Sequence, residues 1–137
     1  LDPLLPETLK KINVNNSIIT VGFQNDVRPY FAISDALVFP SYREGFPNVV
    51  MQAGAMGLPG IVSDINGCNE IILEGRNGTI VPVKNKSALL ERMQLFVEDR
   101  DYYHQLRENS RVMITTRFEQ KVVWDAILEE YKNLTKF

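Results

Sequence analysis

The sequence predicts an α/β fold in which helices cover both faces of a parallel sheet. Short runs rich in Val and Ile alternate with stretches that carry apolar residues at helical spacing. The runs lack alternating polar residues, which is typical of parallel strands buried on both faces. Three repeats of strand and helix favour a doubly wound layer. We expect strands at Ser17–Gly22, Ala36–Pro40, Gly60–Ser63 and Gly78–Pro82.

Helical spacing predicts helices between these strands and after them. The helices between the strands are expected at Asn25–Ser34, Pro47–Met56 and Cys68–Leu73, and a further helix carries Lys10 and Lys11. After the fourth strand, one helix runs from about Ser87 to Glu98 and another over Asp101–Thr115. A last amphipathic helix starts at Glu119, and its broad apolar face consists of Val122, Val123, Ile127, Tyr131 and Leu134.

Length and composition limit the possible functions. The 137 residues suffice for one domain with a hydrophobic core. The net charge of -2 argues against a nucleic-acid-binding surface, and the single cysteine, Cys68, excludes an internal disulfide and a cysteine-rich metal site. The chain starts at Leu1, and its first residues resemble the middle of a longer protein. We therefore expect a fragment; a trimmed but complete small domain is the alternative.

Ligands of such sheets bind beyond the carboxyl ends of the strands. This directs attention to Gly22–Asp26, Ser41–Asn48 and Asp64–Glu70. The second segment is the most informative, because Gly45 permits a close backbone approach to a ligand and Pro47 is well placed to open a helix.

A helix that starts at Pro47 would leave the N–H groups of Phe46, Asn48 and Val49 free. Free N–H donors and the positive end of the helix dipole form an anion site. Glu44 lies just outside this site and could accept hydrogen bonds from sugar hydroxyls, while Gln52 shares a helix face with Asn48. Alternatively, Glu44 merely complements the dipole and Gln52 is a surface residue.

The same segment resembles the donor-site motif of the family-4 retaining glycosyltransferases, GT-B enzymes with two Rossmann-like domains. The resemblance rests on Pro40-Ser41, Glu44-Gly45-Phe46, Ala53, Ala55, Gly57-Leu58-Pro59, Asn66-Gly67, Glu70-Ile71 and Gly78-Thr79-Ile80-Val81-Pro82. It implies a three-layer Rossmann-like domain, the C-terminal nucleotide-sugar-binding half of a GT-B enzyme, spanning residues 1–137. The N-terminal acceptor domain would then be absent.

The resemblance also implies roles for single residues. Glu44 would act in catalysis by contacting hydroxyls of the donor hexose, and the backbone from Gly45 through Phe46, Pro47, Asn48 and Val49 would line the sugar and phosphate. The family's second glutamate, which holds the ribose, is replaced by Gln52, which can still bond two hydroxyls but without charge. Val21, Phe23 and Val27 would pack around the base, although they could equally be core residues. Glu70 is a weaker candidate, because it could simply complement a helix start.

These roles imply transfer of a hexosyl unit from a nucleoside-diphosphate sugar to a carbohydrate or lipid-linked acceptor with retention. The resemblance suggests cell-surface polysaccharide or glycolipid assembly, in the cytoplasm or at the inner face of the membrane. No cofactor and no metal site are expected, and the protein's own N-terminal domain is an expected partner. Because the family's diphosphate-binding Arg and Lys lie upstream, the fragment alone should bind nucleotide poorly and transfer no sugar.

Two other interpretations remain. A non-catalytic nucleotide-sugar-binding or interaction module is favoured by Gln52, whereas a GT-B epimerase is disfavoured by the Glu44 motif. The sole histidine, His104, lies in the helical tail and is expected to be structural. Cys68 has no histidine or acidic neighbour in the sequence, so a nucleophilic role is not expected.

Overall fold

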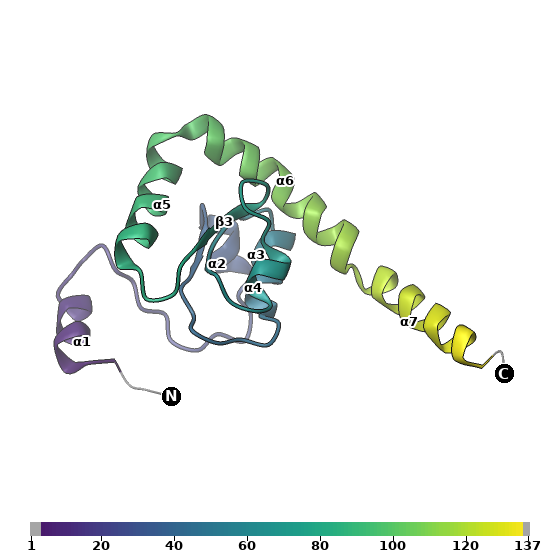
Figure 1. Ribbon diagram of the computed structural model, residues 1–137. Helices are drawn as coiled ribbons and strands as arrows, with labels where there is room; N and C mark the ends of the chain where they lie inside the picture. The colour runs from purple at the N-terminus through teal and green to yellow at the C-terminus, as the bar shows by residue number, and fades with distance from the viewer. Residues whose placement is uncertain (1–3, 136–137) are drawn as a thin grey trace.

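A computed structural model describes residues 4–135 of the chain. Three strands form one parallel sheet, β1 (Leu37–Phe39), β2 (Gly60–Ser63) and β3 (Gly78–Val81), in the order β1-β2-β3. Leu37 pairs with Gly60, and Gly60 pairs with Gly78. The helices are α1 (Pro6–Asn13), α2 (Arg28–Ile33), α3 (Asn48–Ala55), α4 (Cys68–Ile71), α5 (Lys86–Glu98), α6 (Arg100–Phe118) and α7 (Gln120–Leu134) (Figure 1).

The sheet separates two apolar cores, because successive strand residues point to opposite faces. On one face, Val62 packs with residues of α3, α4 and the second half of α6, including Val50, Ile71 and Ile114. On the other face, Ile61 packs with α5 and the first half of α6; this core contains Val81, Phe96, Tyr103 and Leu106. The resulting three layers confirm the predicted α/β fold with its parallel sheet.

The predicted first strand is wrong. Ser17–Gly22 has no regular structure, and Ile19 is 83% exposed. A strand needs a neighbour that takes up its backbone hydrogen bonds, and within residues 4–135 no segment pairs with this one. The apolar residues of Ser17–Gly22 predicted a buried strand, but the described sheet does not cover this segment.

The predicted helices are present, with shifted ends that follow from local capping. The helix expected from Asn25 begins at Arg28, whose N–H donates to the side chain of Asp26. The helix expected from about Ser87 begins at Lys86, because Asn85 caps α5 by accepting from the N–H of Ala88 at 3.0 Å. Asp99 caps α6 in the same way, by accepting from the N–H of Tyr102.

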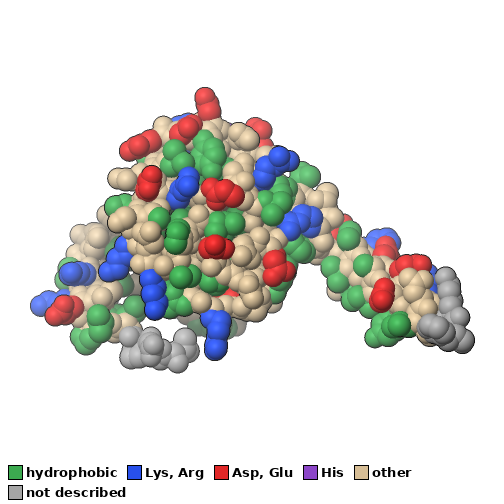
Figure 2. All heavy atoms as spheres, viewed as in Figure 1, with side chains coloured by type: hydrophobic (Ala, Val, Ile, Leu, Met, Phe, Trp, Pro, Cys, Tyr) green, Lys and Arg blue, Asp and Glu red, His purple; other side chains and the backbone are tan. Residues whose placement is uncertain are grey.

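The two terminal helices stand apart from the sheet. Figure 1 shows α1 and α7 at opposite ends of the molecule, and neither has a buried residue. The apolar face predicted for α7 is present but does not cover this domain; Tyr131, for example, is 64% exposed. Green apolar side chains are visible along the protruding helix in Figure 2. None of the helices described within residues 4–135 is both long and apolar enough to cross a membrane.

Asn77 ties the connection between α4 and β3 together. Its side chain is buried, its Oδ1 accepts from the N–H of Leu73 at 2.8 Å, and its Nδ2 donates to the carbonyl of Ile71 at 3.1 Å. Its own carbonyl accepts from the N–H of Gly60. One side chain thus satisfies two main-chain groups at the start of β3.

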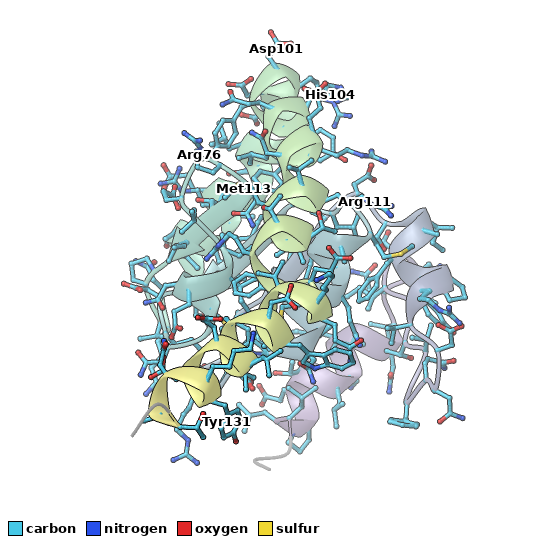
Figure 3. All side chains as sticks on the ribbon, turned by 90° about the vertical axis from the view of Figure 1, so that its right-hand side faces the viewer. Arg76, Asp101, His104, Arg111, Met113 and Tyr131 are labelled. Atoms are coloured by element: carbon cyan, nitrogen blue, oxygen red, sulfur yellow. The ribbon has the colours of Figure 1, made fainter. Side chains whose placement is uncertain are left out.

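We expect Asn77→Ala to lower the free energy of unfolding by roughly 1 to 3 kcal/mol, because the N–H of Leu73 loses its partner, whereas the carbonyl of Ile71 keeps its bond from Arg117. Urea unfolding measures the change. The neighbouring Arg76→Ala is the matched control, since Arg76 is exposed at the surface (Figure 3). The control should shift the free energy by about 0.5 kcal/mol or less. Equal effects of both substitutions would refute the structural role of Asn77.

Candidate functional site

Three connections meet at the carboxyl ends of the strands, along the lower edge of the view in Figure 1. They follow β1 (residues 40–47), β2 (residues 64–67) and β3 (residues 82–85). The predicted site therefore has the position expected for a parallel sheet.

Glu44 lies in the connection after β1, which a side-chain hydrogen bond closes. The hydroxyl of Ser41 donates to Oε1 of Glu44 at 2.7 Å, and Glu44 is half-buried. Glu44 lines a shallow hollow of about 290 Å³ together with Tyr42, Ile65 and Asn66. The carboxylate of Glu44 therefore lies at the carboxyl ends of the strands and borders an open hollow. Sequence analysis missed Ser41 as its partner, although a hydroxyl three residues before a carboxylate in a short loop is a usable signal.

The start of α3 provides the predicted main-chain donors. The helix begins at Asn48, directly after the buried Pro47, and no side chain caps it. The N–H of Val50 donates to the carbonyl of Pro47, whereas those of Phe46, Asn48 and Val49 have no acceptor within residues 4–135. Pro47 thus precedes the helix instead of being its first residue, because its carbonyl accepts the first helical hydrogen bond.

Gly45 does not adopt a conformation that requires glycine, and the space around its Cα is open, which leaves room for a ligand to approach its backbone. Its φ is not positive, and a Cβ on it would meet no atom within 4 Å. Gly67, in the connection after β2, is the residue that must be glycine. Its φ is +78°, and a Cβ there would lie 2.2 Å from the carbonyl oxygen of Gly45. The connections after β1 and β2 therefore pack backbone against backbone.

The surroundings of Cys68 and Glu70 indicate structural roles for both residues. Burial, with a further contribution from the charge of Glu44, raises the pKa of the Cys68 thiol to about 11. A thiol with this pKa is a poor nucleophile at neutral pH. The carboxylate of Glu70 accepts from the N–H of Gly67 at 3.2 Å, which complements the start of α4.

A second hollow, of about 470 Å³, separates α2 from the second half of α3. Its lining brings Gln52 together with Val27, as the predicted ribose and base contacts require. Val21 and Phe23 do not line it, and Phe23 is 90% exposed, so neither is a core residue. The exposed Gln52 and Asn48 follow the loop of Glu44 along the same helix.

His104 does not lie near the candidate site. His104 is near the start of α6, far along the helix from the end that reaches the loops (Figure 3). That end of α6 carries Phe118, whose ring meets the ring of Phe46 edge-on with 5.5 Å between the centroids. Phe46 and Phe118 lie far apart in the sequence, and no feature of the sequence predicted their contact. Residues 4–135 contain no cluster of His, Cys, Asp or Glu that could hold a metal ion.

Comparisons with known proteins agree with this geometry. The family model described as glycosyl transferases group 1 matches residues 5–113. The chain is 24% identical to the capsular polysaccharide biosynthesis glycosyltransferase CapM of Staphylococcus aureus, covering 89% of the chain and 32% of CapM. It is 30% identical to the N,N'-diacetylbacillosaminyl-diphospho-undecaprenol alpha-1,3-N-acetylgalactosaminyltransferase of Campylobacter jejuni, covering 85% of the chain and 31% of that protein.

A solved structure, HepE of Anabaena in complex with UDP-glucose, matches 93% of the chain and 35% of HepE. The TM-score is 0.83 at 20% identity, which shows a common fold. The chain thus spans about a third of the length of these relatives.

The contact of Gly67 with Gly45 can be tested against a matched glycine. Gly75 also has a positive φ, +70°, but a Cβ on it would meet nothing within 4 Å. Gly75→Ala should cost about 1 kcal/mol, the price of the backbone conformation alone. Gly67→Ala should cost at least about 2 kcal/mol more, because the loop of Gly45 must move away. Urea unfolding of both variants measures the difference, and equal losses would show that the close contact is unimportant.

Proposed function

The chain belongs to the glycosyl transferases group 1 family, and we propose that the whole protein transfers a hexosyl unit from a nucleoside-diphosphate sugar to a carbohydrate or lipid-linked acceptor with retention. The fold is that of one half of a GT-B glycosyltransferase. A diphosphate-linked lipid appears in the name of the Campylobacter relative, and HepE was solved with UDP-glucose. These names support a sugar nucleotide as donor and a lipid-linked or polysaccharide acceptor.

The observation that carries this proposal is the combination of free amides and a carboxylate at one open edge. The N–H groups at the start of α3 have no acceptor within residues 4–135 and could bind an anion, and Glu44 lies in the loop before them, on a hollow of its own. Gln52 follows on the same helix and opens on the hollow of Val27. A sugar, a diphosphate and a nucleoside would thus meet Glu44, the amides and Gln52 in that order.

The chemistry follows from where charge develops during transfer. As the bond between the sugar and the diphosphate breaks, negative charge grows on the leaving phosphate, and fixed N–H donors stabilise it without reorganisation. Glu44 holds the sugar: Ser41 occupies its Oε1, whereas Oε2 has no partner in the described part of the chain. That oxygen is available to accept from a sugar hydroxyl, which orients the anomeric carbon.

The proposal includes the setting of the reaction. We place it in the cytoplasm or at the inner face of the membrane, in the assembly of a cell-surface polysaccharide or glycolipid, without a cofactor or a metal ion. A further N-terminal domain would contact the acceptor. By itself, residues 4–135 should bind nucleotide weakly, since one helix start offers the diphosphate only a partial positive charge.

Glu44→Ala in the full-length protein tests the role of the carboxylate. We expect the affinity for the matching sugar nucleotide to fall about 10- to 100-fold, the range for a lost hydrogen bond to a charged group. The affinity for the bare nucleotide should change little. Calorimetric titration against a panel of sugar nucleotides measures both, and Glu91→Ala, an exposed site on α5, is the control. If the affinities for the nucleotide and for the sugar nucleotide fall equally, Glu44 does not contact the sugar.

A non-catalytic sugar-nucleotide-binding module is the second candidate, and Gln52 is the residue that favours it. Gln52→Glu restores the carboxylate that the family uses on the ribose. In an active transferase, the substitution should tighten nucleotide binding and leave transfer detectable by product analysis. A full-length protein that transfers no sugar with either residue, but binds sugar nucleotides with both, would support the binding module instead.

A further inference from the structure

The last residue of α6 packs on the loop after β1. The ring of Phe118 meets the ring of Phe46 edge-on, at an interplanar angle of 67°. Such packing has a preferred geometry, because the positive edge of one ring contacts the negative face of the other. Figure 3 shows α6 running past Met113 toward this end. Phe118 lies beyond residues 5–113, to which the family likeness extends, so the family motif does not account for the contact.

Phe118 is itself held in place by two sets of contacts. Its side chain is half-buried and packs against the core that contains Ile71 and Ile114. The guanidinium of Arg117 lies 4.6 Å from the centroid of the Phe118 ring, and the same guanidinium donates to the carbonyls of Glu70 and Ile71. The ring of Phe118 is therefore a fixed support for whatever packs on it.

Phe46 carries one of the free amides at the start of α3, in a peptide group shared with the carbonyl of Gly45. This peptide bond is trans, as are all those described within residues 4–135, so its N–H and its C=O point in opposite directions. The carbonyl oxygen lies against Gly67, where an added Cβ would be only 2.2 Å away. The N–H of Phe46 therefore points away from Gly67 and from the connection after β2.

The contact with Gly67 does not fix this peptide group by itself. Gly45 has no side chain, and a Cβ on it would meet nothing within 4 Å, so the backbone before the peptide can rotate at little cost. The side chain that follows the peptide is the ring of Phe46, which is 41% exposed. Its aromatic partner within residues 4–135 is Phe118. The direction of the Phe46 N–H thus depends on a residue at the far end of α6.

We propose that Phe118 is a positioning residue of the transfer site: through the ring of Phe46, it holds the Phe46 N–H in the direction of the donor phosphate that carries the sugar. The inference rests on the proposed function, which places a diphosphate at these amides. Phe118 touches no substrate in this arrangement. Without its ring, the loop can stay folded while the amide changes direction, and a hydrogen bond to phosphate weakens when its donor is misaligned.

Phe118→Leu in the full-length protein tests this role, because leucine keeps an apolar side chain but removes the ring. Calorimetric titration with UDP-glucose and GDP-mannose identifies the preferred base, and the matching nucleoside diphosphate and monophosphate are the probes. We expect the affinity for the diphosphate to fall about 3- to 10-fold, part of the effect of losing a hydrogen bond to a charged group. The affinity for the monophosphate, which lacks the phosphate at the amide, should stay the same.

Two further variants separate positioning from stability. Phe118→Tyr keeps the ring and should keep the natural affinity for the diphosphate. Ile114→Val removes a methyl group from the core one turn earlier in α6, so it should lower the stability to urea and leave both affinities unchanged. If Phe118→Leu behaves like Ile114→Val, with lower stability and an unchanged ratio of the two affinities, the proposal is overturned.

A double-mutant cycle shows whether Phe118 acts through Phe46. Phe46→Leu removes the partner ring, so adding Phe118→Leu should lower the diphosphate affinity no further. Losses that add up would overturn the route through Phe46. The two levels of the argument fail differently. A natural protein that binds no sugar nucleotide refutes the proposed function and this inference with it. A natural protein that binds them, with an affinity for the diphosphate that Phe118→Leu does not change, refutes the inference alone.

Discussion

The close contact between Gly67 and the carbonyl of Gly45 is the constraint on which the candidate site depends. It fixes the connection after β1 against the connection after β2, so Glu44 and the start of α3 have one position. The end of α6 supports the loop after β1 and the end of α4. Phe118 packs on Phe46, and Arg117 donates to the carbonyls of Glu70 and Ile71 at the end of α4. The loop after β1 and the end of α4 therefore rest on two adjacent residues of α6.

Much of the fold could be predicted because its signals are local. The strands at residues 37–39, 60–63 and 78–81 are short buried runs, and their helices carry apolar residues at helical spacing. Ser17–Gly22 has an equally apolar composition but no pairing partner in the described sheet, and pairing is a property of distant segments. The helix ends shifted for a related reason, since Asn85 and Asp99 cap through bonds that depend on the loop before each helix.

The features of the candidate site that lie within one segment could also be predicted, whereas those that depend on contacts between segments could not. Glu44, the amides after it and Gln52 belong to one continuous segment, so the sequence sufficed to predict that they share an edge of the sheet. The partner of Glu44, the role of Gly67 and the joining of Gln52 with Val27 depend on contacts between segments. Two glycines illustrate the difference: Gly45 belongs to the local motif, whereas the demand for a glycine arises at Gly67, where two loops meet.

The charges of the domain are divided around Tyr42. On one side, the neutral hydroxyl of Ser41 bonds Glu44, and within residues 4–135 the carboxylate forms no ion pair, although Arg43 lines the same hollow. On the other side, Lys84 lies over the ring and lines a separate hollow, none of whose described lining residues is acidic. Tyr42 lines the hollow of Glu44 as well as this separate hollow, so its ring borders both. Because Ser41 bonds only one oxygen of Glu44, the carboxylate keeps the other available for a hydroxyl-bearing ligand.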